Sequence, residues 1–182
     1  MQALLDWTLK AIRDEGTEFS WMEEMRFDWV PIARSAVMKI AQGQTLLIVT
    51  DNKRRWFSRY IQDNINSREK NRPFIPIYDM KNCFSEFDQI KEKSEIEAME
   101  DMLEISYPNG YFIWYIGNSG YNYTNYVYRN EANFLWLIGE HIQNSISFRE
   151  GDPNIDIKLL QLYKLFDRTM EAILYGEVDP DI

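Results

Sequence analysis

Cysteine and histidine are almost absent from this sequence, which has one of each among 182 residues. A lone cysteine, Cys83, cannot form a disulfide within the chain, and this is typical of proteins from a reducing compartment. A zinc centre needs several clustered ligands, and a catalytic histidine needs a partner that His141 does not have at a recognisable spacing. We therefore expect no metal or other cofactor, and a packing or surface role for His141.

Long apolar runs and surplus positive charge are lacking as well. No segment approaches the roughly twenty consecutive apolar residues that cross a bilayer, and residues 1–16 read as an amphipathic helix instead of a signal peptide. The 29 acidic residues outnumber the 20 lysines and arginines, which gives a net charge of −9. Because such a surface repels phosphate backbones, we expect a cytoplasmic protein that contacts neither a membrane nor nucleic acid directly.

Glycine is missing where an α/β protein would most need it. The stretch TLLIVTD, residues 45–51, reads as a buried strand that leads directly into a helix. Ligands of parallel α/β sheets bind where strands feed helix N-termini, and a phosphate-cradling loop there needs glycine. This turn instead offers Thr50, Asp51, Asn52 and Lys53. The sequence thus predicts the architecture of a nucleotide or sugar-phosphate protein without its phosphate loop.

The remaining composition is that of a globular protein, with 45% hydrophobic and 15% aromatic residues, and we expect a single domain over residues 1–182. Apolar runs alternate with amphipathic segments, which predicts a three-layer α/β fold with a mostly parallel sheet. The expected strands are 45–51 and 111–117 as central neighbours, a Pro76-containing edge strand within 73–80, a short one near 126–129, and 145–148. The expected helices are 1–16, 28–43 capped by Asp28, 53–65, one with a Ser94/Glu97 capping box, 134–142, and a final one with an apolar stripe from Leu159 to Leu174.

Three features could bind a ligand, and each also has a purely structural explanation. Asp51 is placed like a catalytic or Mg²⁺-binding carboxylate, but an N-cap role explains it equally well. The basic cluster within residues 53–59, which includes Arg55, could hold a phosphate or an acidic partner, or could be a solvated face. The loop 117–120, with Ser119, could admit a ligand to backbone amides or be an ordinary turn.

The six tryptophans and eleven tyrosines exceed what a core requires. Such residues are favoured at interfaces because they bury a large area and keep a polar tip. They predict self-association, and a larger core accounts for several of them. The final helix has a regular apolar stripe, and Leu160 and Leu165 lie off it. A helix that is apolar on more than one side is sandwiched within its own fold or shared with another chain.

Four blocks of the sequence carry a family resemblance. They are DWTLKAIRDEG, QTLLIVTDNKRRWFSRYIQDNIN, NFLWLIGEH and, most specific, KLLQLYKLFDRTMEAILY. They resemble the HobA family of epsilonproteobacteria over most of the chain. The resemblance implies a five-stranded parallel sheet between helices, similar to the sugar-isomerase (SIS) domain and to the enterobacterial protein DiaA. It also implies a homotetramer that binds domain I of the replication initiator DnaA, promotes initiator assembly at the chromosomal origin and has no enzymatic role.

The resemblance also defines two alternative sites. Sugar-isomerase domains carry a Gly- and Ser-rich loop at turn 50–53 and a Ser-x-Ser-Gly motif after a later strand, of which only Ser119 and Gly120 remain here. The leading hypothesis is therefore a DnaA-binding scaffold. Its expected partner surface consists of Asn64, Ile65, Asn66, Arg68 and Arg72, although an ordinary solvated connection explains this polar segment as well. The alternative is a sugar-phosphate or nucleotide enzyme or sensor that uses Asp51, Arg55 and Ser119.

Overall fold

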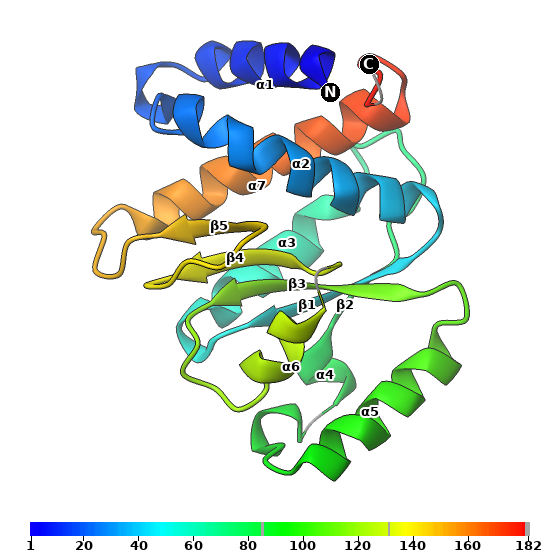
Figure 1. The fold of residues 1–182 in the computed structure, drawn as a ribbon. Coiled ribbons are helices and arrows are strands. Elements are labelled where there is room, and N and C mark those ends of the chain that lie inside the picture. Colours follow the sequence, from blue (N-terminus) through cyan, green and yellow to red (C-terminus); the bar gives the residue numbers. More distant parts are fainter. Residues whose placement is uncertain (85, 131, 181–182) are drawn as a thin grey trace.

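A computed structural model describes residues 1–84, 86–130 and 132–180, and its centre is a five-stranded parallel sheet (Figure 1). The strands are β1 (Thr45–Thr50), β2 (Ile77–Asp79), β3 (Tyr111–Gly117), β4 (Phe134–Ile138) and β5 (Ser145–Phe148). Their order across the sheet is β2-β1-β3-β4-β5, and all four pairings are parallel. The prediction of an α/β fold with helices flanking a parallel sheet is confirmed.

Helices cover both faces of this sheet (Figure 1). One layer contains α1 (Gln2–Asp14), α2 (Met22–Ala41), α3 (Arg55–Ile65) and α7 (Ile155–Leu174). The other contains α4 (Met80–Cys83), α5 (Lys93–Ser106) and α6 (Thr124–Arg129). The described residues also contain three short 3₁₀ turns: η1 (Thr17–Phe19), η2 (Asn52–Arg54) and η3 (Phe87–Gln89).

The strands are apolar on both faces because each face is covered by helices. Successive side chains of a strand point to opposite faces, so Leu46 and Ile48 pack with α2, α3 and α7, whereas Leu47 and Val49 pack with α4, α5 and α6. All six residues of β1 are buried. A central strand such as β1 therefore needs apolar residues on both faces, and its sequence does not alternate between polar and apolar residues.

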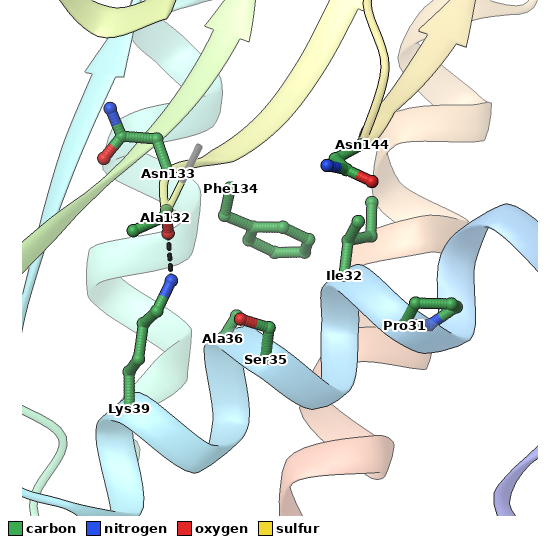
Figure 2. A pocket seen from close by; sticks show the side chains of 9 residues that line it. All are labelled: Pro31, Ile32, Ser35, Ala36, Lys39, Ala132, Asn133, Phe134 and Asn144. Atoms are coloured by element: carbon green, nitrogen blue, oxygen red, sulfur yellow. Dashed lines mark hydrogen bonds between the residues drawn. The ribbon is translucent and has the colours of Figure 1, made fainter. Parts of the chain in front are cut away.

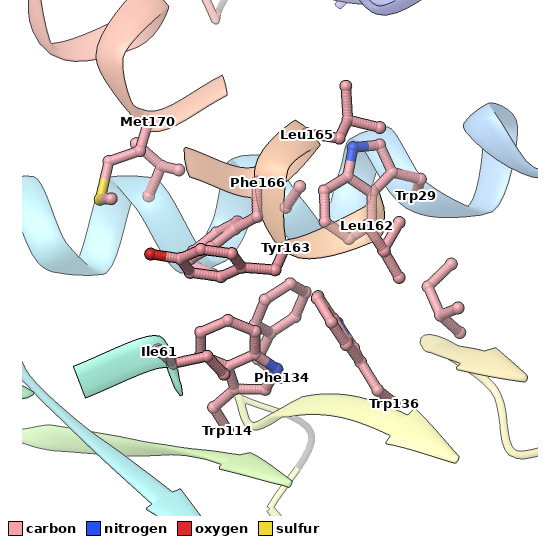
Figure 3. Packing of buried hydrophobic residues seen from close by; sticks show 14 of the residues in the cluster. Trp29, Ile61, Trp114, Phe134, Trp136, Leu162, Tyr163, Leu165, Phe166 and Met170 are labelled. Carbon is pink, nitrogen blue, oxygen red and sulfur yellow. The ribbon is translucent and has the colours of Figure 1, made fainter. Parts of the chain in front are cut away.

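Aromatic rings fill the core beneath α2 and α7 (Figure 3). Trp29, Trp114 and Trp136 are each 0% exposed, and the rings of Trp114 and Trp136 meet edge to face with centroids 4.8 Å apart. Phe166 of α7 lies 5.1 Å from Trp114 and 6.2 Å from Trp29. Three of the six tryptophans that predicted self-association are thus buried in the core of the chain itself.

Several predictions made from the sequence agree with the positions of the strands and helices. Segments 45–51 and 111–117 are central neighbours, and the proline-containing segment supplies an edge strand, β2, that starts directly after Pro76. The helix expected over 53–65 is α3, in which Phe57, Ile61 and Ile65, spaced by four, are buried on one face. Within the described residues, no helix is long and apolar enough to cross a membrane.

Two predicted elements have the opposite secondary structure. Residues 134–142 were expected to form a helix, but Phe134–Ile138 is strand β4 and His141 lies in the loop after it. Residues 126–129 were expected to form a strand, but they belong to helix α6. Short apolar runs do not distinguish a buried strand from a buried helix. Pairing of β4 with both β3 and β5 decides the first case.

Two helix starts were also predicted wrongly. Helix α2 begins at Met22, before the predicted Asp28 cap, and carries Pro31 in its interior. Burial of Met22 and Trp29 within this helix outweighs the weak local preferences that favoured a later start. The capping box of α5 is formed by Glu92 and Glu95 instead of Ser94 and Glu97.

Helix α7 has two apolar sides because it is sandwiched within its own chain. It packs against α1 and α2 on one side, while its inner side meets the sheet (Figure 1). Leu165, which lies off the main stripe, is 2% exposed. Of the two explanations for this pattern, packing within the fold accounts for most of the helix.

Candidate functional site

The first candidate site is the crevice between the carboxyl ends of β1 and β3. The chain leaves β1 for α3 on one face of the sheet and leaves β3 for α6 on the other. This reversal is the position at which parallel α/β sheets bind ligands. Asp51 follows β1 here, and Asn118 follows β3.

The Asp51 carboxylate fills this crevice. Its side chain is 1% exposed, and Oδ1 accepts the backbone N–H of Arg54 at 3.0 Å. Oδ2 accepts Nη1 of Arg54 at 2.5 Å and the backbone N–H of Asn118 at 3.3 Å. The N-cap role predicted for Asp51 is confirmed, because it caps the 3₁₀ turn η2. Both of its oxygens thus accept hydrogen bonds from protein donors.

The backbone of β3 closes directly on Asp51. A Cβ atom added at Gly117 would lie 2.8 Å from Cβ and 2.9 Å from Oδ2 of Asp51. Real Cβ atoms do not tolerate such distances, so glycine is needed at position 117 for close packing against the aspartate. The glycine of this loop therefore admits a protein side chain where a phosphate would otherwise approach.

Two tyrosines and a lysine cover the same end of the sheet. The hydroxyl of Tyr123 donates to the Thr50 carbonyl at 3.4 Å, and the Tyr121 hydroxyl accepts the N–H of Asn52 at 3.2 Å. Lys81 donates to Oδ1 of Asn52 at 3.1 Å and pairs with Asp88 at 2.7 Å. Burial raises the pKa of Tyr123 far above its ordinary value. This phenol therefore stays protonated near neutral pH.

The other predicted ligand-binding residues are exposed or are engaged with protein partners. Arg55 and Ser119 are exposed, and Arg59 is engaged with Asp63 at 2.9 Å on the surface of α3. His141 lies 3.0 Å from the Ser147 hydroxyl through Nδ1. In residues 1–84, 86–130 and 132–180, no three His, Cys, Asp or Glu side chains are grouped to hold a metal ion.

A second hollow, of about 180 Å³, lies between α2 and the amino ends of β4 and β5 (Figure 2). Lys39 donates to the carbonyl oxygen of Ala132, and its Nζ lies 5.2 Å from the ring centroid of Phe112. Burial lowers the pKa of this lysine. The ammonium group is thus used to connect α2 to the segment before β4.

The second candidate site is the predicted partner segment at the end of α3. Of its five residues, Ile65 is fully buried and Asn64 turns back to its own helix, where Nδ2 donates to the Tyr60 carbonyl at 2.7 Å. Asn66 forms two hydrogen bonds with the backbone of Ile75, at 2.8 and 2.9 Å. These bonds close the loop 66–75 at its base and fix its shape.

Arg72 belongs to an ionic cluster beneath the loop and is its most buried member. Its side chain is 1% exposed, and its guanidinium pairs with Asp167 at 2.6 Å and with Glu171 at 3.3 Å, both on α7. It also donates to the carbonyl of Ile65. Lys70 pairs with the same two carboxylates. Desolvation lowers the pKa of both cations, opposed by attraction to Glu171.

The outer surface of the loop presents Arg68 and Phe74. Arg68 is exposed, and Phe74 is 84% exposed, the highest value among the exposed large hydrophobic residues described. A hollow of about 240 Å³ lies beside them, lined also by Asn66, Ser67, Lys70 and Arg72. We name Arg68, Phe74 and this hollow the loop surface. Phe74 was not predicted as a site residue because the segment 73–80 was read as a strand, in which a phenylalanine is ordinary core.

Comparisons with known proteins agree on one family. A family model described as HobA, DNA replication regulator, matches residues 1–180. The chain is 29% identical over 186 residues to the DNA replication regulator protein HobA of Helicobacter pylori (strain ATCC 700392 / 26695), covering 98% of this chain and 99% of that protein.

Solved structures agree with the sequence match. A crystal structure of a HobA–DnaA (domain I–II) complex from Helicobacter pylori is similar with a TM-score of 0.76 at 27% identity, over 96% of this chain and 97% of that chain. A crystal structure of Helicobacter pylori HobA gives a TM-score of 0.74 at 25% identity over 96% of each chain.

Proposed function

The chain belongs to the HobA family of DNA replication regulators, and from this premise we propose that it binds domain I of the initiator DnaA as a non-enzymatic scaffold. The observation that carries the proposal is the similarity over 96% of the chain to a HobA that was crystallised with DnaA domains I–II. A homotetramer that holds several DnaA molecules would raise their effective concentration at the origin. DNA contact would then be indirect, which suits a net charge of −9.

The packing at the switch point supports a role without catalysis. The Asp51 carboxylate is neutralised by Arg54 and lies against the backbone of Gly117. A sugar phosphate would need donors and space at this position, and both are taken by protein atoms. This packing favours the scaffold over the alternative, an enzyme or sensor that uses Asp51, Arg55 and Ser119.

We place the DnaA contact on the loop surface. Phe74 supplies an exposed aromatic side chain, and Arg68 supplies a cation beside the hollow. Aromatic residues and arginine dominate the binding energy of protein interfaces. Asn66 and Arg72 would contribute by holding the loop in place, since their polar groups bond within the chain.

The test is calorimetric titration of the intact protein with recombinant DnaA domain I, accompanied by light scattering of the protein alone. Replacing a central aromatic residue costs about 2 kcal/mol, so Phe74→Ala should weaken binding about 30-fold. Arg68→Glu should weaken it as well. Phe27→Ala is the matched control, because Phe27 is also exposed but lies on α2.

The outcomes separate the three parts of the proposal: DnaA binding, the loop surface and the tetramer. Absence of binding by the unmodified protein would refute the DnaA scaffold itself. Unchanged binding by both loop variants would refute only the loop surface. A monomer in light scattering would refute the tetramer.

A further inference from the structure

Helix α5 has an apolar stripe that the described part of the chain leaves exposed. Its inner stripe, with Met99 and Leu103, is buried against the sheet. Ala98, Met102 and Ile105, spaced by four and three, form a second stripe on the same helix. Met102 is 47% exposed and Ile105 is 81% exposed.

A groove lies beside this second stripe. It has a volume of about 390 Å³ and separates α5 from the segment that contains η3. Its apolar lining consists of Phe84, Phe87, Ile90, Ala98, Met99 and Met102. Methionine and aromatic side chains adapt to different apolar partners, and grooves of this kind accept the apolar face of a helix.

The charge around the groove selects among partners. Helix α5 carries five carboxylates against the single Lys93, which is itself paired with Glu97 at 3.0 Å. Glu86 and Glu95 are among the residues that line the groove. A second copy of this chain would bring another acidic α5 to this face, and nucleic acid or an anionic membrane would bring phosphates; all three are repelled.

We propose that this groove is a docking site for an amphipathic helix with an apolar face and basic flanks, supplied by another protein. The apolar face fills the groove along Met102 and Ala98, and the basic flanks meet the carboxylates of α5. The groove lies in the helical layer opposite the one that contains α3 and α7. Binding here is therefore independent of the loop surface and does not rest on the proposed contact with DnaA.

The experiment uses fluorescence polarisation of a synthetic leucine–lysine peptide, about 18 residues long, with its leucines on one helix face. The comparison peptides are a scramble of the same composition, which spreads the leucines around the helix, and a version with glutamate in place of lysine. We expect saturable binding of the first peptide by the intact protein, weakened by added salt, and no comparable binding of the other two.

Substitutions then locate the site. Met102→Lys places a positive charge in the groove, where it repels the lysines of the peptide, and should weaken binding by at least about tenfold. Ala98→Lys should act in the same direction; both positions are exposed on a helix, so the fold should be retained, as circular dichroism would verify. Ile157→Lys makes the same change in net charge on α7, where Ile157 is 56% exposed, and should leave binding nearly unchanged.

Each result supports or overturns the proposal. Equal binding of the scrambled peptide would show that attraction to an acidic surface, without the groove, explains the interaction. Equal loss with Ile157→Lys would show the same. Preferential binding of the glutamate peptide, or full binding by both Met102→Lys and Ala98→Lys, would also refute it.

Discussion

Replacing Arg72 by methionine should destabilise the protein more than any change to a surface ion pair. Methionine keeps much of the alkyl volume but leaves Asp167 with Lys70 as its only partner in the cluster, and deprives the Ile65 carbonyl of a donor. Removing one member of a buried ion pair costs about 3–5 kcal/mol, and the remaining lysine favours the lower end, about 3 kcal/mol. In a chain of this size that corresponds to a fall in melting temperature of about 6–12 °C.

Urea unfolding and a thermal melt at neutral pH would measure this loss. Arg59→Met is the matched control, since Arg59 also pairs with an aspartate but is 77% exposed. An exposed pair of that kind contributes at most about 1 kcal/mol. If Arg72→Met and Arg59→Met were destabilised equally, the reasoning that the cluster fixes the loop to α7 would be wrong. Loosening of the loop should also raise amide exchange at residues 66–75.

Two further predictions concern packing and ionisation. Gly117→Ala should cost about 1–3 kcal/mol of unfolding free energy, because its methyl group would meet Asp51 at 2.8 Å. Gly120→Ala, whose added Cβ would lie 3.4 Å from Asn118, should be nearly neutral in the same denaturation assay, and equal effects would refute the close contact. Alkaline pH should also destabilise the fold, since burial raises the pKa values of Tyr115, Tyr123, Tyr126, Tyr128 and Tyr163. These tyrosines contribute to folding stability in full below the unfolded tyrosine pKa of about 10, and the contribution is lost as pH rises from there through the folded pKa values. Tyrosinate absorbance during an alkaline titration would measure their ionisation. If all eleven tyrosines ionised normally in the folded protein, this prediction would be contradicted.

The sequence pattern was sufficient to predict an element wherever its apolar spacing is long and regular or a proline restricts its position. The final helix and the helix after β1 follow from the spacing of their apolar residues, and the edge position of β2 follows from Pro76. The secondary structure of Phe134–Ile138 was predicted wrongly because a run of five apolar residues is compatible with either a helix or a strand. Only its hydrogen-bonding neighbours, β3 and β5, make it a strand.

The candidate sites also have features that could be predicted from the sequence and features that could not. The absence of glycine at turn 50–53 was visible in the sequence and predicted that this turn is not a phosphate loop. What occupies the crevice instead was not visible, because the Asp51 contact with Gly117 joins residues far apart in the chain. A charged residue such as Arg72 likewise reads as a surface residue until its carboxylate partners on α7 are known.

The sequence by itself therefore determined the fold class, the family and the lack of a phosphate loop, because these depend on short-range spacing and composition. The tertiary structure alone decided that Arg72 is buried, that Phe74 is exposed and that α5 keeps an uncovered apolar stripe. Exposure depends on which distant elements pack over a side chain, and that information is not contained in the residue or in its neighbours along the chain.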